Sequence, residues 1–221
     1  MSEAVDIRVV CEGPTDTLVI RSAVEALGVE AVVTQIQPEN NSNLLGTLGE
    51  FGGGWKGVRA WCQSPFIREF LHVTLANARA LVIHVDADIA HDKELSCAKP
   101  CPPARDTTDA VRAVVTGWLG AATVPPKVVL CVPAMATEAW VFCALFPEDK
   151  LTAGIECRKQ PAALLVPRKP RLVAKKKDRY AKDTVAYEAA RETLKAGWRT
   201  SVPRLCGEGA RFLAELRAAI T

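Results

Sequence analysis

The chain has 221 residues, of which 49% are hydrophobic and 24% are charged, and its formal net charge is +3. These values are close to globular averages and exclude collagen, coiled coil and wholesale disorder. No apolar run approaches the roughly 20 residues of a membrane span, and the N-terminal segment lacks the basic and apolar regions of a signal peptide. We therefore expect a cytoplasmic protein without membrane contact, whose eight cysteines are reduced.

Short β-branched runs alternate with helical patterns along the first two thirds of the chain. Strands are expected at 7–11, 30–37, 80–85 and 127–132, and helices at 15–27, 65–78, 106–119, 138–145, 183–196 and 208–220. The first helix is expected to begin at Thr15 or Asp16 as N-cap and to end at Gly28. This alternation predicts an α/β fold with a Rossmann-like, mainly parallel sheet of about four strands flanked by helices.

The character of the chain changes after Pro147. We therefore expect an α/β domain at 1–147, and at 148–221 a basic segment with C-terminal helices packed on that domain. Residues 158–182 include ten lysines or arginines and one acid, so this segment carries +9 while the rest of the chain carries −6. Such asymmetry indicates a strip that binds a polyanion. A solvated, partly disordered linker is the alternative for a basic run that contains prolines.

Acidic residues follow three of the four predicted strands. Glu12 ends the first strand, Asp86 and Asp88 end the third, and Glu138 lies just past the fourth. Ligands of open parallel sheets bind outside the carboxyl ends of the strands, and carboxylates gathered there repel one another unless a cation lies between them. Oxygen ligands of this kind favour Mg²⁺ or Mn²⁺. A first-turn acid placed by the helix dipole is the alternative for Glu138.

The segments VVCEGPTD and LVIHVDAD resemble the two signature motifs of the TOPRIM domain. The resemblance spans about 7–145, with a motif core of Glu12-Gly13 and Asp86-Ala87-Asp88. The chain is most similar to small stand-alone proteins related to the OLD-family nucleases and linked to phage defence. In that group a Gly-rich loop such as GGGWKG, a Glu-Ala-Trp segment, a Tyr–Lys pair and a segment such as CGEGARF recur.

This resemblance implies a metal-dependent nuclease acting on DNA or RNA. It implies that Glu12 is a general acid/base or metal ligand, that Asp86 and Asp88 hold Mg²⁺, and that Glu138 is an additional metal-site acid. It further implies a lysine that assists catalysis, for which Lys182 is expected and Lys56 is the alternative. The resemblance also implies a separately encoded ATPase partner, because the chain has no GxxxxGK[ST] phosphate-binding loop. The residues expected to contact nucleic acid are basic: Lys56, Arg168, Lys169, Arg171, Lys175, Lys176, Lys177 and Arg179.

Other interpretations of these residues stay open. His91, Cys97 and Cys101 suggest zinc, although their spacing matches no standard finger. His84 lies in an apolar strand, which is typical of a core histidine. Tyr180 could in principle be a nucleophile, but the chain lacks the further domains of a strand-passing enzyme. A non-catalytic scaffold that binds an ATPase or nucleic acid, and a nuclease directed at RNA in a defence system, are the rival functions.

Overall fold

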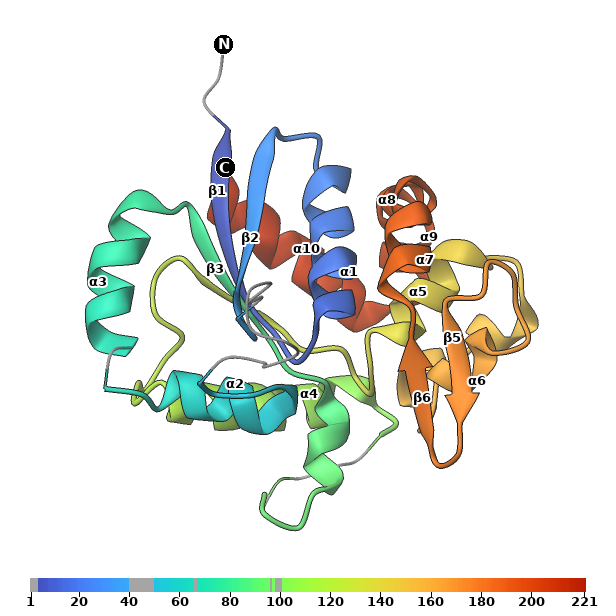
Figure 1. Ribbon diagram of the computed structural model, residues 1–221, viewed down its shortest axis with the longest axis horizontal. Helices are drawn as coiled ribbons and strands as arrows, with labels where there is room; N and C mark the ends of the chain where they lie inside the picture. The colour runs from blue at the N-terminus through green and yellow to red at the C-terminus, as the bar shows by residue number, and fades with distance from the viewer. Residues whose placement is uncertain (1–3, 40–49, 66, 96, 98–100) are drawn as a thin grey trace.

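A four-stranded parallel sheet forms the centre of the protein, as seen in a computed structural model that describes residues 4–39, 50–65, 67–95, 97 and 101–221 (Figure 1). Its strands are β1 (Val5–Val10), β2 (Ala31–Gln37), β3 (Ala80–His84) and β4 (Val128–Cys131), in the spatial order β2-β1-β3-β4. Every neighbouring pair is parallel. All four carboxyl ends therefore lie at one edge, and the predicted α/β fold is confirmed.

Helices cover both faces of this sheet. One hydrophobic cluster joins alternate strand residues such as Ile7 and Val9 to α1 (Pro14–Ala26), α5 (Glu138–Leu145), α8 (Arg191–Arg199) and α10 (Gly207–Ile220). The other cluster joins the intervening strand residues, such as Val10 and Leu81, to α2 (Gly54–Cys62), α3 (Ile67–Asn77) and α4 (Ala104–Trp118). Since strand side chains alternate between faces, each face has its own apolar layer, and β3 is buried along its whole length.

Several helix boundaries differ from those predicted. The first helix begins at Pro14 after the N-cap residue Gly13, so neither Thr15 nor Asp16 is the N-cap. Proline is favoured at the first helical position because its missing N–H would have no partner there. The Gly-rich segment expected to be a loop contains the start of α2, while residues 40–49 of that loop lie outside the described residues. The helix expected at 183–196 is two helices, α7 (Thr184–Ala189) and α8.

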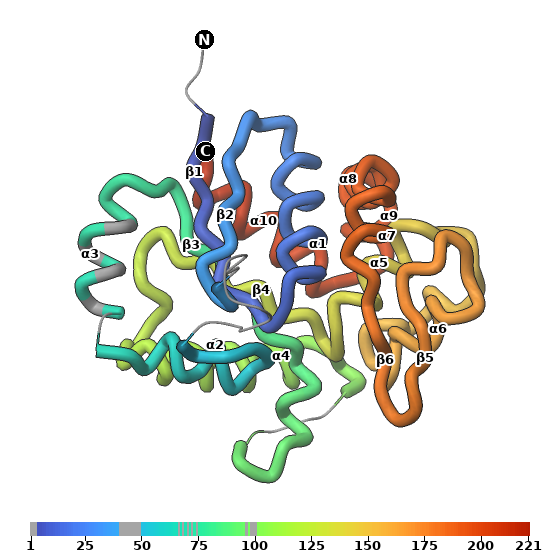
Figure 2. The backbone as a smooth tube through the Cα atoms, in the orientation of Figure 1, coloured from blue at the N-terminus to red at the C-terminus, as the bar shows by residue number. Residues whose placement is uncertain are grey.

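The basic segment is ordered rather than a linker. Two 3-10 turns, η2 (Lys150–Thr152) and η3 (Ile155–Cys157), precede it, and it contains the short helix α6 (Ala162–Leu165). An antiparallel hairpin of β5 (Val173–Lys176) and β6 (Arg179–Lys182) follows. Figure 2 shows the chain continuing from this hairpin through α7, α8 and α9 (Ser201–Leu205) to α10, which crosses behind the sheet. Residues on both sides of Pro147 fill one core cluster.

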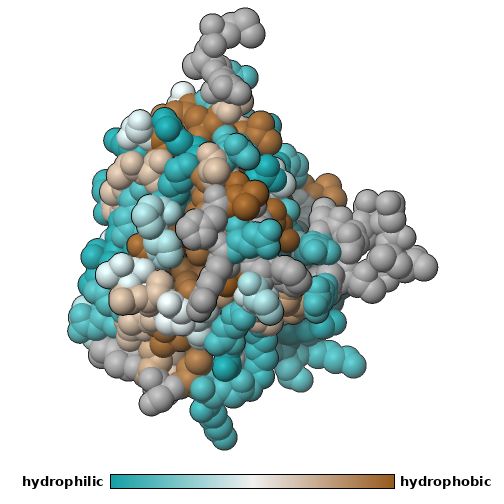
Figure 3. All heavy atoms as spheres, turned by 90° about the vertical axis from the view of Figure 1, so that its left-hand side faces the viewer, coloured by the Kyte–Doolittle hydropathy of each residue, from teal (hydrophilic) through white to brown (hydrophobic). Residues whose placement is uncertain are grey.

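A disulfide joins Cys101 to Cys157, so the expectation that all eight cysteines are reduced is wrong for this pair. The bond ties the segment before α4 to η3, and the two Cα atoms are 5.4 Å apart. Hydrophilic residues are spread over the face seen in Figure 3 and interrupt the hydrophobic ones. Within the described residues, no helix is both long and apolar enough to cross a membrane.

Candidate active site at the carboxyl ends of the strands

Glu12 and Asp86 meet at the edge where β1 and β3 end. The Asp86 backbone N–H donates to Glu12 Oε1 at 2.8 Å. Asp86 Oδ1 in turn accepts from the Thr137 backbone N–H at 3.2 Å. The segments that follow β1, β3 and β4 are therefore tied together at Asp86, because adjacent parallel strands bring their carboxyl ends to the same place.

A second cluster of side chains lies beside the cluster of Glu12 and Asp86, and it contains a lysine. Lys182, the last residue of β6, places its Nζ 2.6 Å from Glu138 Oε1 and 3.6 Å from Asp16 Oδ1. The Tyr187 hydroxyl donates to Glu138 Oε1 at 3.3 Å, and Thr137 Oγ1 donates to Asp16 Oδ1 at 2.9 Å. Glu138, expected to be a metal ligand, is thus paired with Lys182 and fully buried.

His84 lies between the two clusters. Its Nε2 is 3.1 Å from Asp86 Oδ1, and its Nδ1 is 3.9 Å from Asp16 Oδ2. Burial opposes a charge on this side chain, but Asp16 and Asp86 raise the pKa of His84 to about 9. The expectation of a core histidine is correct as to burial, and the imidazole lies between Asp16 and Asp86, whose charges favour its protonated form.

The carboxyl groups of the site have unequal proton affinities. Burial and the charge of Asp86 raise the pKa of Glu12 to about 8. Asp88 lies at the exposed rim, where partial burial of its carboxyl group and the charge of Asp86 raise its pKa to about 7. Burial opposes ionisation of Asp16, but Lys182 and His84 hold the pKa of Asp16 below its usual value. Lys182 and His84 thus favour the ionised form of Asp16, whereas burial and the charge of Asp86 disfavour ionisation of Glu12 and Asp88.

A cleft of about 310 Å³ opens onto these groups. We call it the acidic cleft; its walls include Glu12, Asp16, Asp86 and Lys182. Gly54, at the start of α2, also lines it, and its backbone N–H donates to the Glu12 carbonyl oxygen at 2.9 Å. A ligand in this cleft would reach both the carboxylates and the lysine.

The donor set suits a partly hydrated Mg²⁺ ion better than a fully protein-bound metal. Among the described residues, no three His, Cys, Asp or Glu side chains are arranged to hold a metal ion. Mg²⁺ commonly takes one or two carboxylates and completes its shell with water and substrate phosphates. Burial and the neighbouring charge of Asp86 raise the pKa values of Glu12 and Asp88, and a bound cation would offset both effects.

The residues expected to bind nucleic acid fall into two groups. Six of them are exposed on or next to the β5–β6 hairpin: Lys169, Arg171, Lys175, Lys176, Lys177 and Arg179. Arg168 differs, because its guanidinium pairs with Asp149 and lies 5.2 Å from the Phe146 ring centre, which are contacts that hold the fold together. Lys56 pairs with Glu94 and lies 5.4 Å from the Trp55 ring centre.

The zinc interpretation of the cysteines is wrong for Cys101, because a sulfur in a disulfide is no thiolate ligand. His91 is exposed at the end of the 3-10 helix η1 (Ala87–His91). The Tyr180 hydroxyl donates to Gln160 Oε1 at 3.3 Å on the surface. Neither residue is among those that line the acidic cleft.

Sequence reasoning missed Asp16, His84, Thr137 and Tyr187 as members of the site. No protein-family model, curated protein or solved structure matches the chain. The resemblance to TOPRIM proteins therefore rests on the quoted motifs, and the functional argument rests on the geometry described above.

Proposed function

We propose that this protein is a Mg²⁺-dependent nuclease of the TOPRIM type, which hydrolyses phosphodiesters of nucleic acid. The observation that carries the proposal is the contact between Glu12 and Asp86 under an open cleft. Asp88 stands at the rim of the same edge, and the basic hairpin ends in the cleft at Lys182. Acids that repel one another beside a basic surface suit a metal ion and a phosphate together.

Each side chain has a distinct part in this mechanism. Asp86 and Asp88 would hold Mg²⁺, which when bound supplies Lewis-acid polarisation of the phosphate and a more acidic water. Glu12 uses Oε1 to accept the Asp86 N–H, so its Oε2 is the atom that carries a proton to or from the reacting oxygens. Lys182 is paired with Asp16 and Glu138 and lines the cleft, where its ammonium group can also donate to a phosphate oxygen.

A non-catalytic scaffold is the second candidate, and two observations favour it. The described residues contain no three-ligand metal group, and the cation Lys182 is already paired with Asp16, one of the three acids that line the cleft, and with the buried Glu138. In that case the fold would dock an ATPase or nucleic acid without cleaving it, since fold does not fix function.

The setting of the activity is also part of the proposal. The resemblance supports a cytoplasmic role in anti-phage defence beside a separately encoded ATPase, with DNA or RNA as substrate. The disulfide between Cys101 and Cys157 is an observation against a uniformly reducing compartment, because such bonds are rare where thiols are kept reduced.

Cleavage assays on plasmid DNA, single-stranded DNA and RNA test the proposal, each with Mg²⁺, Mn²⁺ or EDTA. We expect metal-dependent cleavage that Asp86→Asn abolishes and that Glu12→Gln slows by roughly 10²–10⁴-fold. Asp106→Asn, an exposed first-turn acid of α4, is the matched control and should cleave normally. Cleavage by Asp86→Asn at the normal rate would refute the assignment. Absence of both cleavage and calorimetric Mn²⁺ binding would favour the scaffold.

A further inference from the structure

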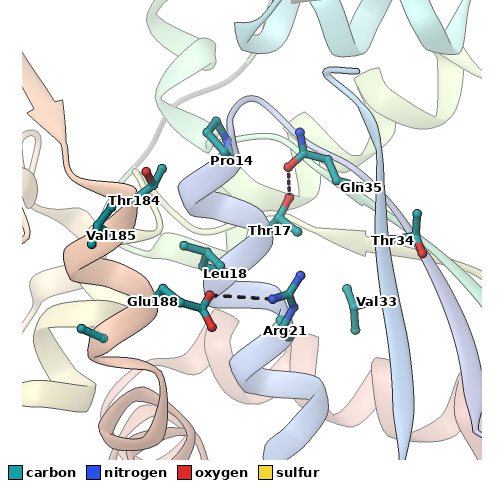
Figure 4. A pocket seen from close by; sticks show the side chains of 11 residues that line it. Pro14, Thr17, Leu18, Arg21, Val33, Thr34, Gln35, Thr184, Val185 and Glu188 are labelled. Atoms are coloured by element: carbon teal, nitrogen blue, oxygen red, sulfur yellow. Dashed lines mark hydrogen bonds and ion pairs between the residues drawn. The ribbon is translucent and has the colours of Figure 1, made fainter. Parts of the chain in front are cut away.

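A second and larger hollow lies across the outer face of α1. Its volume is about 930 Å³. We call it the α1 trough: its floor is Pro14, Leu18 and Arg21, which share one helix face, and its walls come from β2 around Thr34 and from α7 around Val185 (Figure 4). The Arg21 and Glu188 side chains point toward each other across the trough, with 3.7 Å between Nη1 and Oε2.

The trough lies next to the acidic cleft. Pro14 and Thr184 line both hollows. Thr184 begins α7 and follows Lys182 by two residues, so the basic hairpin, the cleft and the trough succeed one another along one stretch of chain. Figure 1 shows the same order, with β6 leading into α7 beside α1. A chain molecule held at the cleft would therefore extend into the trough on one side and along the hairpin on the other.

The two sides differ in chemistry. The hairpin exposes lysines and arginines, which bind phosphates. In the trough the charge of the single arginine, Arg21, is offset by Glu188. The other lining residues are apolar, such as Leu18 and Val185, or carry hydroxyl or amide groups, such as Thr34. A duplex presents its phosphates outward, whereas an unpaired strand exposes base faces and base edges. The near-neutral, partly apolar trough thus suits bases rather than phosphates.

We propose that the α1 trough binds the bases of an unpaired nucleic acid strand whose phosphodiester lies in the acidic cleft. The substrate class is then single-stranded DNA or RNA, or an unpaired segment of either. The placement of the phosphodiester rests on the proposed nuclease function, while strand binding in the trough does not. In this arrangement Glu188 weakens binding through its charge and Arg21 strengthens it.

The test measures the affinity of fluorescently labelled single-stranded DNA, single-stranded RNA and duplex DNA by anisotropy in EDTA, where no cleavage occurs. We expect Glu188→Gln to tighten single-strand binding and Arg21→Gln to weaken it, each by about threefold. The exposed ion pair of Arg204 with Glu148 supplies matched controls. Arg204→Gln and Glu148→Gln make the same charge changes outside the trough and should shift affinity less. The DNA and RNA arms identify the preferred strand.

Each other outcome overturns the trough assignment. Absence of single-strand binding by the wild-type protein, equal shifts in the trough and control variants, or equal shifts for duplex and single strand would do so; the trough would then serve another partner, such as a peptide. The nuclease proposal fails separately. A protein that shows the expected binding pattern but cleaves nothing with Mg²⁺ or Mn²⁺ would refute the nuclease and leave the trough assignment standing.

Discussion

Lys182 Nζ lies 2.6 Å from Glu138 Oε1, so the end of the basic hairpin is joined to the first turn of α5. The same carboxylate oxygen accepts from the Tyr187 hydroxyl. Burial opposes a charge on Lys182, but Asp16 and Glu138 raise its pKa well above the usual value. Burial and the charge of Glu138 raise the pKa of Tyr187 well above its usual value, which keeps the hydroxyl a donor. The lysine thus holds together three elements distant in the chain.

Lys182→Ala should destabilise the protein by about 3–5 kcal/mol, because it leaves Asp16 and Glu138 buried without their cation. Urea denaturation measures the free energy of unfolding. The double variant Lys182→Met with Glu138→Gln should lose less than the sum of the two single changes, since fewer unpaired charges remain.

Lys175→Ala is the control for this change. Lys175 is exposed on β5, so its removal should alter stability by no more than about 0.5 kcal/mol. If Lys182→Ala were equally mild, the ion pair would contribute nothing and the hairpin would be anchored by its apolar contacts alone.

Removing Lys175, Lys176 and Arg179 together should weaken nucleic acid binding and reduce its salt dependence. Each phosphate contact contributes roughly 0.7–0.9 to the slope of log K against log salt. Anisotropy titrations at several salt concentrations measure this slope. Arg168→Ala is the control, because this guanidinium contacts Asp149 and Phe146 instead of facing solvent with the hairpin. It should lower stability and leave the slope unchanged. If Arg168→Ala reduced the slope and the triple variant did not, the binding surface would lie at Arg168 rather than on the hairpin.

The strands and the acids that follow them could be predicted because both depend on local pattern. Val82 and Ile83 lie in a continuous apolar run, and Asp86 follows at a fixed distance. The partners of those acids could not be predicted. Asp16 contacts Thr137 across 121 positions of sequence. No local sequence pattern around Asp16 indicates that contact. The hairpin was missed because lysine-rich strands have low β-propensity, and the pairing of Cys101 with Cys157 cannot be deduced from spacing.

Reduction of the disulfide between Cys101 and Cys157 should destabilise the protein by about 4 kcal/mol, because the bond closes a long loop in the unfolded chain. The two cysteines are 56 positions apart. Urea denaturation with and without dithiothreitol measures the difference. The double variant Cys101→Ser with Cys157→Ser should have the same free energy of unfolding as the reduced wild-type protein, and dithiothreitol should not change it. Equal stability of the wild-type protein in both conditions would show that the bond does not form.

Close packing of α8 against α5 depends on the absence of a side chain at Gly197. A Cβ atom there would lie 2.5 Å from the Ala144 Cα and 2.9 Å from its carbonyl oxygen. These are backbone atoms that cannot move without displacing α5, which carries Glu138. Gly197→Ala should therefore destabilise the protein by about 1–3 kcal/mol, measured by urea denaturation.

Gly117→Ala is a matched control for this substitution, because Gly117 also lies within a helix, α4, but has open space where the new Cβ would be. Alanine restricts the unfolded chain more than glycine does, so this variant should be more stable by about 0.5–1 kcal/mol. The two substitutions are chemically identical. Opposite signs of their changes in the free energy of unfolding would therefore show that the contact with Ala144 causes the difference. Stabilisation by Gly197→Ala would mean that α8 and α5 are further apart than this packing requires, and the position of Glu138 beside Lys182 would have to be revised with it.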